Sequence, residues 1–199
     1  MPVFNNDEQK RIAALLKTVK ITKDVAWYKN VFLPKIVKNK EVYKAIANYF
    51  RCPIVFPALL HSREMSSDVG RFKAYLGNGQ PLDKKTTIVP KGRGPFPTFV
   101  AGAIDALSLK KIQDITDWSV ERMLFECERY NGFGYRAKKI NSPYVWNFTN
   151  HYTGGHYVAD GKFSLTAKDR NMGVATTYLI LKELDPEFAV SKVAMRMMR

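Results

Sequence analysis

The stretch CPIVFPALLHSREMSSDVGRF, residues 52–72, decides the fold of this chain. Its first half is apolar, and Phe56, Leu60 and Glu64 recur at intervals of four residues. That spacing places them on one face of a helix that we predict over residues 53–66. The face ends on a carboxylate, and we expect its partial burial to disfavour the ionised form and raise the pKa. Glu64 is therefore a candidate general acid, unless it only pairs with a basic neighbour at the helix end.

The next segment, residues 68–97, is rich in glycine and proline and has no helical period. Asn78-Gly79 is typical of a tight turn, and Thr86 to Val89 favour a strand. We therefore predict a small β-hairpin beside the helix that ends at Glu64, followed by an irregular loop.

The rest of the chain is mostly helical in pattern, apart from a loop-rich, aromatic stretch over residues 130–163. Apolar periodicity predicts helices over 6–19, 24–37 (interrupted at Pro34), 39–50, 98–109, 118–131 and 166–184. Asn6 or Asp7 can cap the first of these helices, and Asp117 can cap the helix over 118–131. The expected fold class is α+β, mostly α, with residues 1–50 as an N-terminal helical extension and residues 51–199 as the main domain.

The composition indicates a globular protein with a packed core and argues against a disulfide framework. Hydrophobic residues make up 46% of the 199, enough to build a packed core. A charge of +14, from 32 Lys and Arg against 18 Asp and Glu, attracts polyanions such as nucleic acid, anionic membrane or a bacterial envelope. Two cysteines, Cys52 and Cys127, are too few for a disulfide framework and suit buried thiols.

No apolar run approaches the length of a membrane helix. The N-terminal residues MPVFNNDEQK have neither a basic start nor an apolar core of a signal peptide, so we expect synthesis in the cytoplasm.

Several long motifs resemble a family of lysozyme-like peptidoglycan hydrolases of phages and bacteria, the endolysin type. The match spans roughly Pro53 to Leu184, and the first 50 residues lie outside it. More distantly, the chain is similar to soluble lytic transglycosylases, with a glutamate that ends a helix and a later motif like Arg129 to Gly132. The motifs that carry the resemblance are REMS (63–66), YLGNGQPL (75–82), TTIVPKGRGPF (86–96), DAL (105–107), YNGFGYR (130–136), SPYVW (142–146) and NHYTGGHYVADGKF (150–163).

The resemblance implies a lysozyme-like domain that cleaves the β-1,4 bond between N-acetylmuramic acid and N-acetylglucosamine. Glu64 matches the catalytic glutamate, and Thr86 matches a threonine that positions water in some phage lysozymes. Sugar binding needs aromatic platforms and amide groups, and no cofactor or metal is expected, because the three histidines lack ligand spacing. The candidate sugar-binding residues are Asn78, Tyr130, Asn131, Tyr135, Trp146, His151 and Tyr152.

Two features depart from the family pattern. Met65 stands where serine usually follows the glutamate, and the segment from Ser66 to Arg71 is longer than usual. A hydrolase usually needs a second carboxylate, whereas a transglycosylase needs only one acid/base group. Asp68 and Asp83 are the candidates for the second carboxylate. We favour hydrolysis over transglycosylation; a glycan-binding relative without activity and a basic nucleic-acid-binding protein are the alternatives.

The expected partner is bacterial peptidoglycan. Without a signal peptide, the protein is expected to reach the wall by holin release or as part of a phage or phage-tail-like particle. The lysines of residues 1–50 suggest that this extension targets the wall or docks on such a particle.

Overall fold

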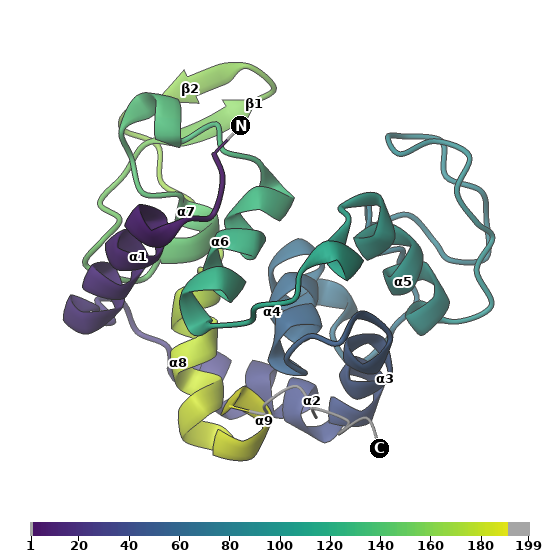
Figure 1. Ribbon diagram of the computed structural model, residues 1–199. Coiled ribbons are helices and arrows are strands. Elements are labelled where there is room, and N and C mark those ends of the chain that lie inside the picture. Colours follow the sequence, from purple (N-terminus) through teal and green to yellow (C-terminus); the bar gives the residue numbers. More distant parts are fainter. Residues whose placement is uncertain (1, 191–199) are drawn as a thin grey trace. The chain divides into compact units, whose positions relative to one another are not determined.

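The computed structural model describes residues 2–190, and within this range the chain forms nine α-helices and one two-stranded antiparallel sheet (Figure 1). The expected mostly helical α+β class is thereby confirmed. The chain forms two compact units, which are described one at a time. Unit 1 comprises residues 2–25 and Ser119–Ile180, and unit 2 comprises Ala26–Trp118 and residues 181–190.

Unit 1 begins with α1 (Asn6–Thr18), close to the predicted helix. Asn5 caps it, not Asn6 or Asp7, because the Asn5 side-chain oxygen accepts a hydrogen bond from the Glu8 amide at 3.0 Å. The helix packs on α6 (Val120–Asn131) and buries Ile12. The cap of α6 is Ser119, not Asp117, since the Ser119 hydroxyl accepts from the Arg122 amide.

The sheet of unit 1 consists of β1 (His156–Ala159) and β2 (Lys162–Ser164), in a stretch that the sequence indicated only as loop. His156 pairs with Ser164 and Tyr157 with Phe163 in the antiparallel register. The Tyr157 and Phe163 rings meet at 5.1 Å between centroids, and such cross-strand aromatic pairs stabilise short hairpins. The short helix α7 (Pro143–Trp146) was likewise not predicted.

The last long helix, α8 (Val174–Leu184), starts eight residues later than predicted. Asn147 provides the reason: its buried side-chain amide donates hydrogen bonds to the carbonyls of Asp169 and Asn171. These bonds hold the preceding segment as a loop. Gly173 then passes so close to the chain that a Cβ there would lie 2.5 Å from the Val145 carbonyl oxygen.

Unit 2 begins with a continuous helical stretch over residues 26–38. Its middle is a π-helical turn, η1 (Tyr28–Phe32), which is followed by α2 (Leu33–Lys38). Pro34 has no amide proton, and its ring clashes with the carbonyl four residues earlier in a regular helix. The wider turn, in which the Leu33 amide donates to the Tyr28 carbonyl, accommodates that proline.

The core of unit 2 is formed by three helices: α3 (Lys40–Phe50), α4 (Val55–Glu64) and α5 (Phe99–Leu109). Helix α3 packs against both α4 and α5. Pro57 is tolerated because it lies in the first turn of α4, where its missing amide proton would have no helical partner. Shorter elements complete the unit: η2 (Ser66–Asp68), η3 (Ile112–Asp114) and α9 (Pro186–Val190), of which α9 packs on α4.

The predicted strand over Thr86–Val89 is wrong. Residues 69–98 form a long loop without a ladder, seen as the blue-green trace at the right of Figure 1. Only an isolated antiparallel bridge joins Ala74 to Pro81. Side-chain amides take the hydrogen bonds that a partner strand would make, as described below.

The first 50 residues are shared between the units. Residues 2–25 belong to unit 1, and Ala26–Phe50 belong to unit 2 together with the helices that follow. The role of residues 1–50 as an extension stays a prediction.

Candidate functional site

Glu64 lies at the C-terminal end of α4, the most deeply buried helix of unit 2. All eight residues from Val55 to Ser62 are buried, Arg63 is half-buried, and Glu64 is exposed. The Met65 amide closes the helix by donating to the His61 carbonyl at 3.0 Å. The carboxylate of Glu64 is thus exposed to solvent at the end of a helix that is packed in the core.

The exposure of Glu64 corrects one expectation. Phe56 and Leu60 are buried as the spacing predicted, but the stripe does not stay inside at its third member. Within the last turn, His61 and Ser62 are buried and Glu64 is exposed, and Met65 after it is buried again, so the burial that the sequence suggested for Glu64 is absent. His61 faces Tyr43 and Asp68 instead.

Behind Glu64, a buried polar cluster joins Tyr43, His61 and Asp68. The Tyr43 hydroxyl lies 3.0 Å from His61 Nδ1, and His61 Nε2 lies 3.5 Å from Asp68 Oδ2. Burial lowers the pKa of His61 to about 4, although Asp68 opposes this shift, and burial together with Asp68 raises the pKa of Tyr43. In the tautomer with the proton on Nε2, a neutral His61 accepts from Tyr43 at Nδ1, and the 3.5 Å from Nε2 to Asp68 is an electrostatic contact without hydrogen-bond geometry.

Asp68 uses its carboxylate to shape the turn after Glu64. Its oxygens accept hydrogen bonds from the backbone amides of Lys73 at 3.0 and 3.1 Å and of Ala74 at 3.2 Å. The side chain is buried. This candidate second carboxylate thus holds the segment that the sequence singled out as longer than usual. Asp83, the other candidate, is exposed on the loop.

Because His61 is buried, we expect the folded protein to lose stability in acid. Its pKa in the folded protein, about 4, lies below the ordinary value of 6.5, so the unfolded chain binds the additional proton between these values. The contribution of neutral His61 to the free energy of unfolding is fully present above pH 6.5, and about 3 kcal/mol of it is lost as the pH drops to 4. Urea unfolding at several pH values measures this change. His61→Gln should flatten the curve over that window, and an unchanged slope would contradict the assignment.

The loop after Asp68 is held together by side-chain amides. Gln80 Oε1 accepts from the amides of Thr87 at 2.7 Å and Ile88 at 3.2 Å, and Gln80 Nε2 donates to the Thr87 hydroxyl. Asn78 Nδ2 donates to the Ile88 carbonyl at 3.1 Å, while Asn78 Oδ1 accepts from the Gln80 amide. Two of the motifs quoted above, residues 75–82 and 86–96, therefore bind each other. The candidate sugar ligand Asn78 is half-buried among these bonds.

Thr86 is buried in the same loop. Its hydroxyl donates to the Pro90 carbonyl at 2.5 Å and accepts from the Arg93 amide at 2.9 Å. The hydroxyl proton is thus engaged within the loop, and one lone pair is left to accept from a water. Its role in positioning water stays a prediction.

Asp105 on α5 anchors the loop to the helical core. It accepts from the Tyr75 hydroxyl at 2.7 Å and from Arg93 Nε at 3.0 Å, and Arg93 makes a second contact through its terminal nitrogen. Burial would raise the pKa of Asp105, but the hydrogen bonds from Arg93 and Tyr75 outweigh it and lower the pKa. The Tyr75 ring also stacks on Phe96, with 5.0 Å between centroids. Sequence reasoning quoted Asp105 only as part of a motif and missed this role.

Removal of this anchor should release the loop. Asp105→Ala takes away the acceptor for both Tyr75 and Arg93, and we expect trypsin to cut the loop at Lys84, Lys85 or Lys91 about tenfold faster. Mass spectrometry of a limited digest locates the cuts. Asp114→Ala, at an exposed aspartate of the same unit, is the matched control and should digest as wild type does. Equal rates for both variants would exclude Asp105 as the anchor.

Unit 1 holds the remaining candidate sugar ligands. Tyr130 and Asn131 end α6, where Gly132 adopts a φ of +100° and stops the helix. Tyr130 is buried and Asn131 is exposed. Trp146 is buried in the core, where its ring meets that of His151 edge-on at 5.4 Å.

Three other candidates in unit 1 have structural contacts. The Tyr135 hydroxyl lies 2.9 Å from His156 Nδ1, and Tyr135 is buried. The His151 Nε2 lies 2.8 Å from the Leu15 carbonyl at the end of α1. Tyr152 is buried, and its hydroxyl donates to the Gly155 carbonyl. These contacts fold the aromatic segment, whereas sugar binding by the same residues stays a prediction.

Arg136, in the motif over residues 130–136, clamps two acids. Its guanidinium donates to Glu128 at 3.0 and 2.6 Å and to Glu8 of α1 at 2.6 Å. It also lies over the rings of Phe125 and Phe133. Burial lowers the pKa of Arg136 in itself, but the hydrogen bonds with Glu128 and Glu8 outweigh it and raise the pKa. Residue spacing gave no signal for this cluster, because Glu8 and Arg136 are far apart in the chain.

Among the helices of residues 2–190, none has both the length and the apolar character needed to cross a bilayer. No cluster of three or more His, Cys, Asp or Glu side chains suited to a metal ion occurs in that range, and both cysteines are buried thiols.

Comparison with known proteins gives no relative. The chain matches no protein-family model, no curated protein and no solved structure.

Proposed function

We propose that this protein is a peptidoglycan glycosidase that cleaves the β-1,4 bond between N-acetylmuramic acid and N-acetylglucosamine, with Glu64 as general acid. The observation that carries the proposal is the position of Glu64. It is the exposed carboxylate at the end of an otherwise buried helix, and the segment that follows it is held by Asp68. The motif resemblance supplies the substrate class.

In this proposal, Glu64 protonates the glycosidic oxygen as the bond to the sugar breaks. In this proposal a bound glycan displaces water from the carboxyl group, and the loss of water disfavours the ionised form. Desolvation by the substrate thus replaces the burial that the sequence suggested.

Amide groups are the ligands that we propose for the sugar. Asn131 is exposed in unit 1, and Asn78 is half-buried in unit 2. The aromatic candidates Tyr135 and Trp146 are buried, and in this proposal they contribute indirectly, by stabilising the fold of unit 1 that carries Asn131.

Lytic transglycosylation is the second candidate reaction. It needs one acid/base group, because the hydroxymethyl group of the sugar itself attacks, whereas a hydrolase generally uses a second carboxylate. Asp68 favours this alternative, since its carboxylate is buried and engaged with backbone amides. Hydrolysis would then require a water held by another group, such as Thr86.

Product analysis tests both reactions. Purified peptidoglycan is digested with the wild-type protein and the soluble fragments are read by mass spectrometry. Reducing muramic acid ends indicate hydrolysis, and 1,6-anhydro ends indicate transglycosylation. Intact glycan strands with retained binding would show a glycan-binding protein without activity, and salt-sensitive DNA binding without glycan binding would favour the nucleic-acid alternative.

We also propose that peptidoglycan is the physiological partner, reached after holin release or on a phage or phage-tail-like particle. The first helix is built into unit 1 through Glu8–Arg136, and Phe4 just before it contacts the ring of Phe125, so deletion of this segment would disturb the unit. Charge reversal is the cleaner test. Lys10→Glu with Lys17→Glu changes two exposed lysines of α1 and should weaken binding to wall or particle if α1 docks there.

A further inference from the structure

The loop of unit 2 carries an exposed apolar pair at residues 88 and 89. Ile88 is 53% exposed and Val89 is 79% exposed. We call this pair, with Pro90, the loop apex. Two β-branched apolar side chains that are neighbours in the sequence and exposed to water are available for an apolar contact with another phase or molecule.

Two of the three residues of the apex, Ile88 and Pro90, have backbone groups that are hydrogen-bonded within the loop. The Ile88 amide donates to Gln80 Oε1, and the Ile88 carbonyl accepts from Asn78 Nδ2. Pro90 has no amide proton, and its carbonyl accepts from the Thr86 hydroxyl. Backbone groups that already have partners lose little on entering a medium poor in water, where bare amides and carbonyls would cost several kcal/mol each.

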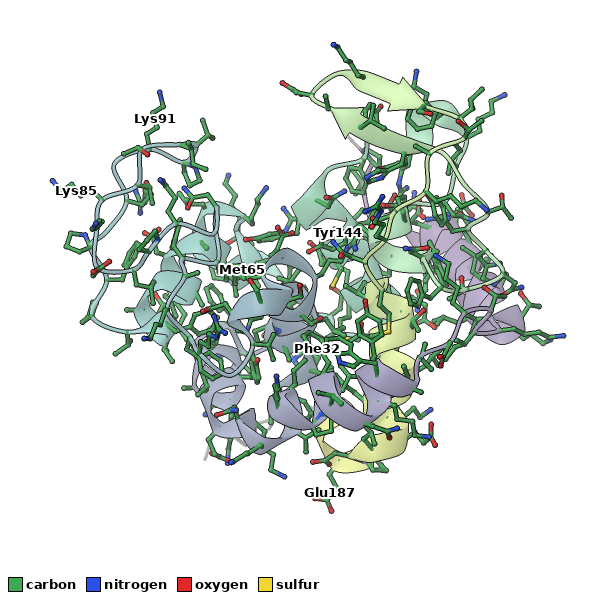
Figure 2. The ribbon with its side chains drawn as sticks, turned by 180° about the vertical axis from the view of Figure 1, so that it is seen from behind. Phe32, Met65, Lys85, Lys91, Tyr144 and Glu187 are labelled. Carbon is green, nitrogen blue, oxygen red and sulfur yellow. The ribbon has the colours of Figure 1, made fainter. Side chains whose placement is uncertain are left out.

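Positive charge surrounds the apex. Lys84, Lys85 and Lys91 are exposed on the same loop, and Asp83 is the acid within residues 83–93. Figure 2 shows Lys85 and Lys91 on the outer part of the loop, with their side chains directed away from its centre. Arg93 is instead engaged with Asp105.

We propose that the loop apex docks on the interface of an anionic lipid bilayer, with Ile88 and Val89 entering the headgroup region and the three lysines contacting lipid phosphates. A soluble polyanion such as teichoic acid or nucleic acid would satisfy the lysines but offers no apolar phase for the pair. An apolar tip with flanking lysines is typical of peripheral membrane contacts, and the internal hydrogen bonds of Ile88 and Pro90 lower the cost of such a contact. The proposal does not depend on the proposed glycosidase activity.

Vesicle flotation tests the proposal with the full-length protein. Vesicles of phosphatidylcholine alone are compared with vesicles that contain one part phosphatidylglycerol to three parts phosphatidylcholine. We expect tight binding to the anionic vesicles only. Each of the three lysines near an anionic surface contributes about fivefold to the partition coefficient, so a triple Lys→Gln variant should bind on the order of 100-fold more weakly.

A double variant separates the contribution of the apolar pair to vesicle binding from that of the lysines. Ile88→Ser with Val89→Ser keeps every lysine, and the partition coefficient should fall about tenfold or more. The matched control is Val158→Ser with Leu165→Ser, since these side chains of unit 1 are 61% and 78% exposed. The control should float as wild type does.

A fluorescent probe reports whether the apex enters lipid. Val89→Cys, labelled with an environment-sensitive fluorophore, should shift to the blue on anionic vesicles, and labelled Leu165→Cys should not. Labelling is selective because Cys52 and Cys127 are buried. The proposal would be overturned if residue 89 showed no blue shift. It would also be overturned if the lysine variant lost binding to vesicles and to soluble polyanions equally while the serine pair had no effect. Weaker binding of the serine pair to purified peptidoglycan, with vesicle binding unchanged, would likewise assign the apex to glycan and not to lipid.

Discussion

Glu64→Gln should reduce peptidoglycan cleavage about 1000-fold, the range that general acid catalysis contributes. Glutamine keeps the size of the side chain and its capacity for hydrogen bonds but carries no transferable proton. The loss should appear in the turnover rate more than in binding to the polymer, because the missing proton matters only as the glycosidic bond breaks. Reducing or anhydro ends released per minute from purified peptidoglycan measure the rate, and sedimentation with the polymer measures binding.

Two controls show whether the loss of cleavage comes from Glu64 itself: the stability of the variant and the activity of a variant at another glutamate. Glu64 is exposed, so the variant should unfold at the wild-type urea concentration. Glu41→Gln is the matched control, because Glu41 is an exposed helical glutamate of the same unit that pairs with the exposed Lys44 on the surface. The control should cleave as wild type does. Undiminished cleavage by Glu64→Gln would remove Glu64 from the mechanism, whatever the products are.

Arg136→Met should destabilise the protein by about 3 kcal/mol, because the buried Glu128 carboxylate would keep the distant Arg11, 3.9 Å away, but lose its hydrogen-bonded partner. Glu128 would lose its two hydrogen bonds from the guanidinium while remaining buried. Glu8 would lose the link from α1 to this cluster. Urea unfolding at neutral pH measures the loss, and hydrogen exchange should show α1 opening more readily than in the wild type.

The double variant Arg136→Met with Glu128→Leu should recover most of the loss, since an apolar pair of similar volume needs no charge compensation. Arg170→Met, at an exposed arginine of the same unit, is the control and should change stability by about 0.5 kcal/mol or less. A loss below about 1 kcal/mol for Arg136→Met would mean that solvent screens the cluster.

The helices were largely predictable, because apolar periodicity reports which face of a segment is buried. The helices α1, α3, α5 and α6 begin and end within about two residues of the prediction, the usual uncertainty of helix ends. The start of α8 was not predictable, since it depends on the contact of Asn147 with residues 169 and 171.

The loop shows why strand propensity misled. Thr86 to Val89 have the β-branched side chains of a strand, and in isolation that preference is correct. A strand, however, requires a partner backbone, and here Gln80 and Asn78 occupy the amides and carbonyls instead. Propensity describes one segment, whereas pairing depends on which other segment comes close in the fold.

The candidate site was likewise predictable in part. The spacing of Phe56, Leu60 and Glu64 was sufficient to place a carboxylate at the end of a buried helix. It was insufficient to tell that Glu64 is exposed while His61 in the same turn is buried, because exposure depends on which segments pack against each face of the helix.

By itself the sequence determined the helical class, the segments that form the core and the position of Glu64 on its helix, since these follow from local spacing of apolar residues. Only the tertiary structure decided the partners of the polar side chains. Asp68 meets His61, Asp105 meets Arg93, and Arg136 meets Glu8 through contacts between segments that are separated along the chain. Such contacts depend on the path of the folded chain, which brings together groups that no local pattern relates.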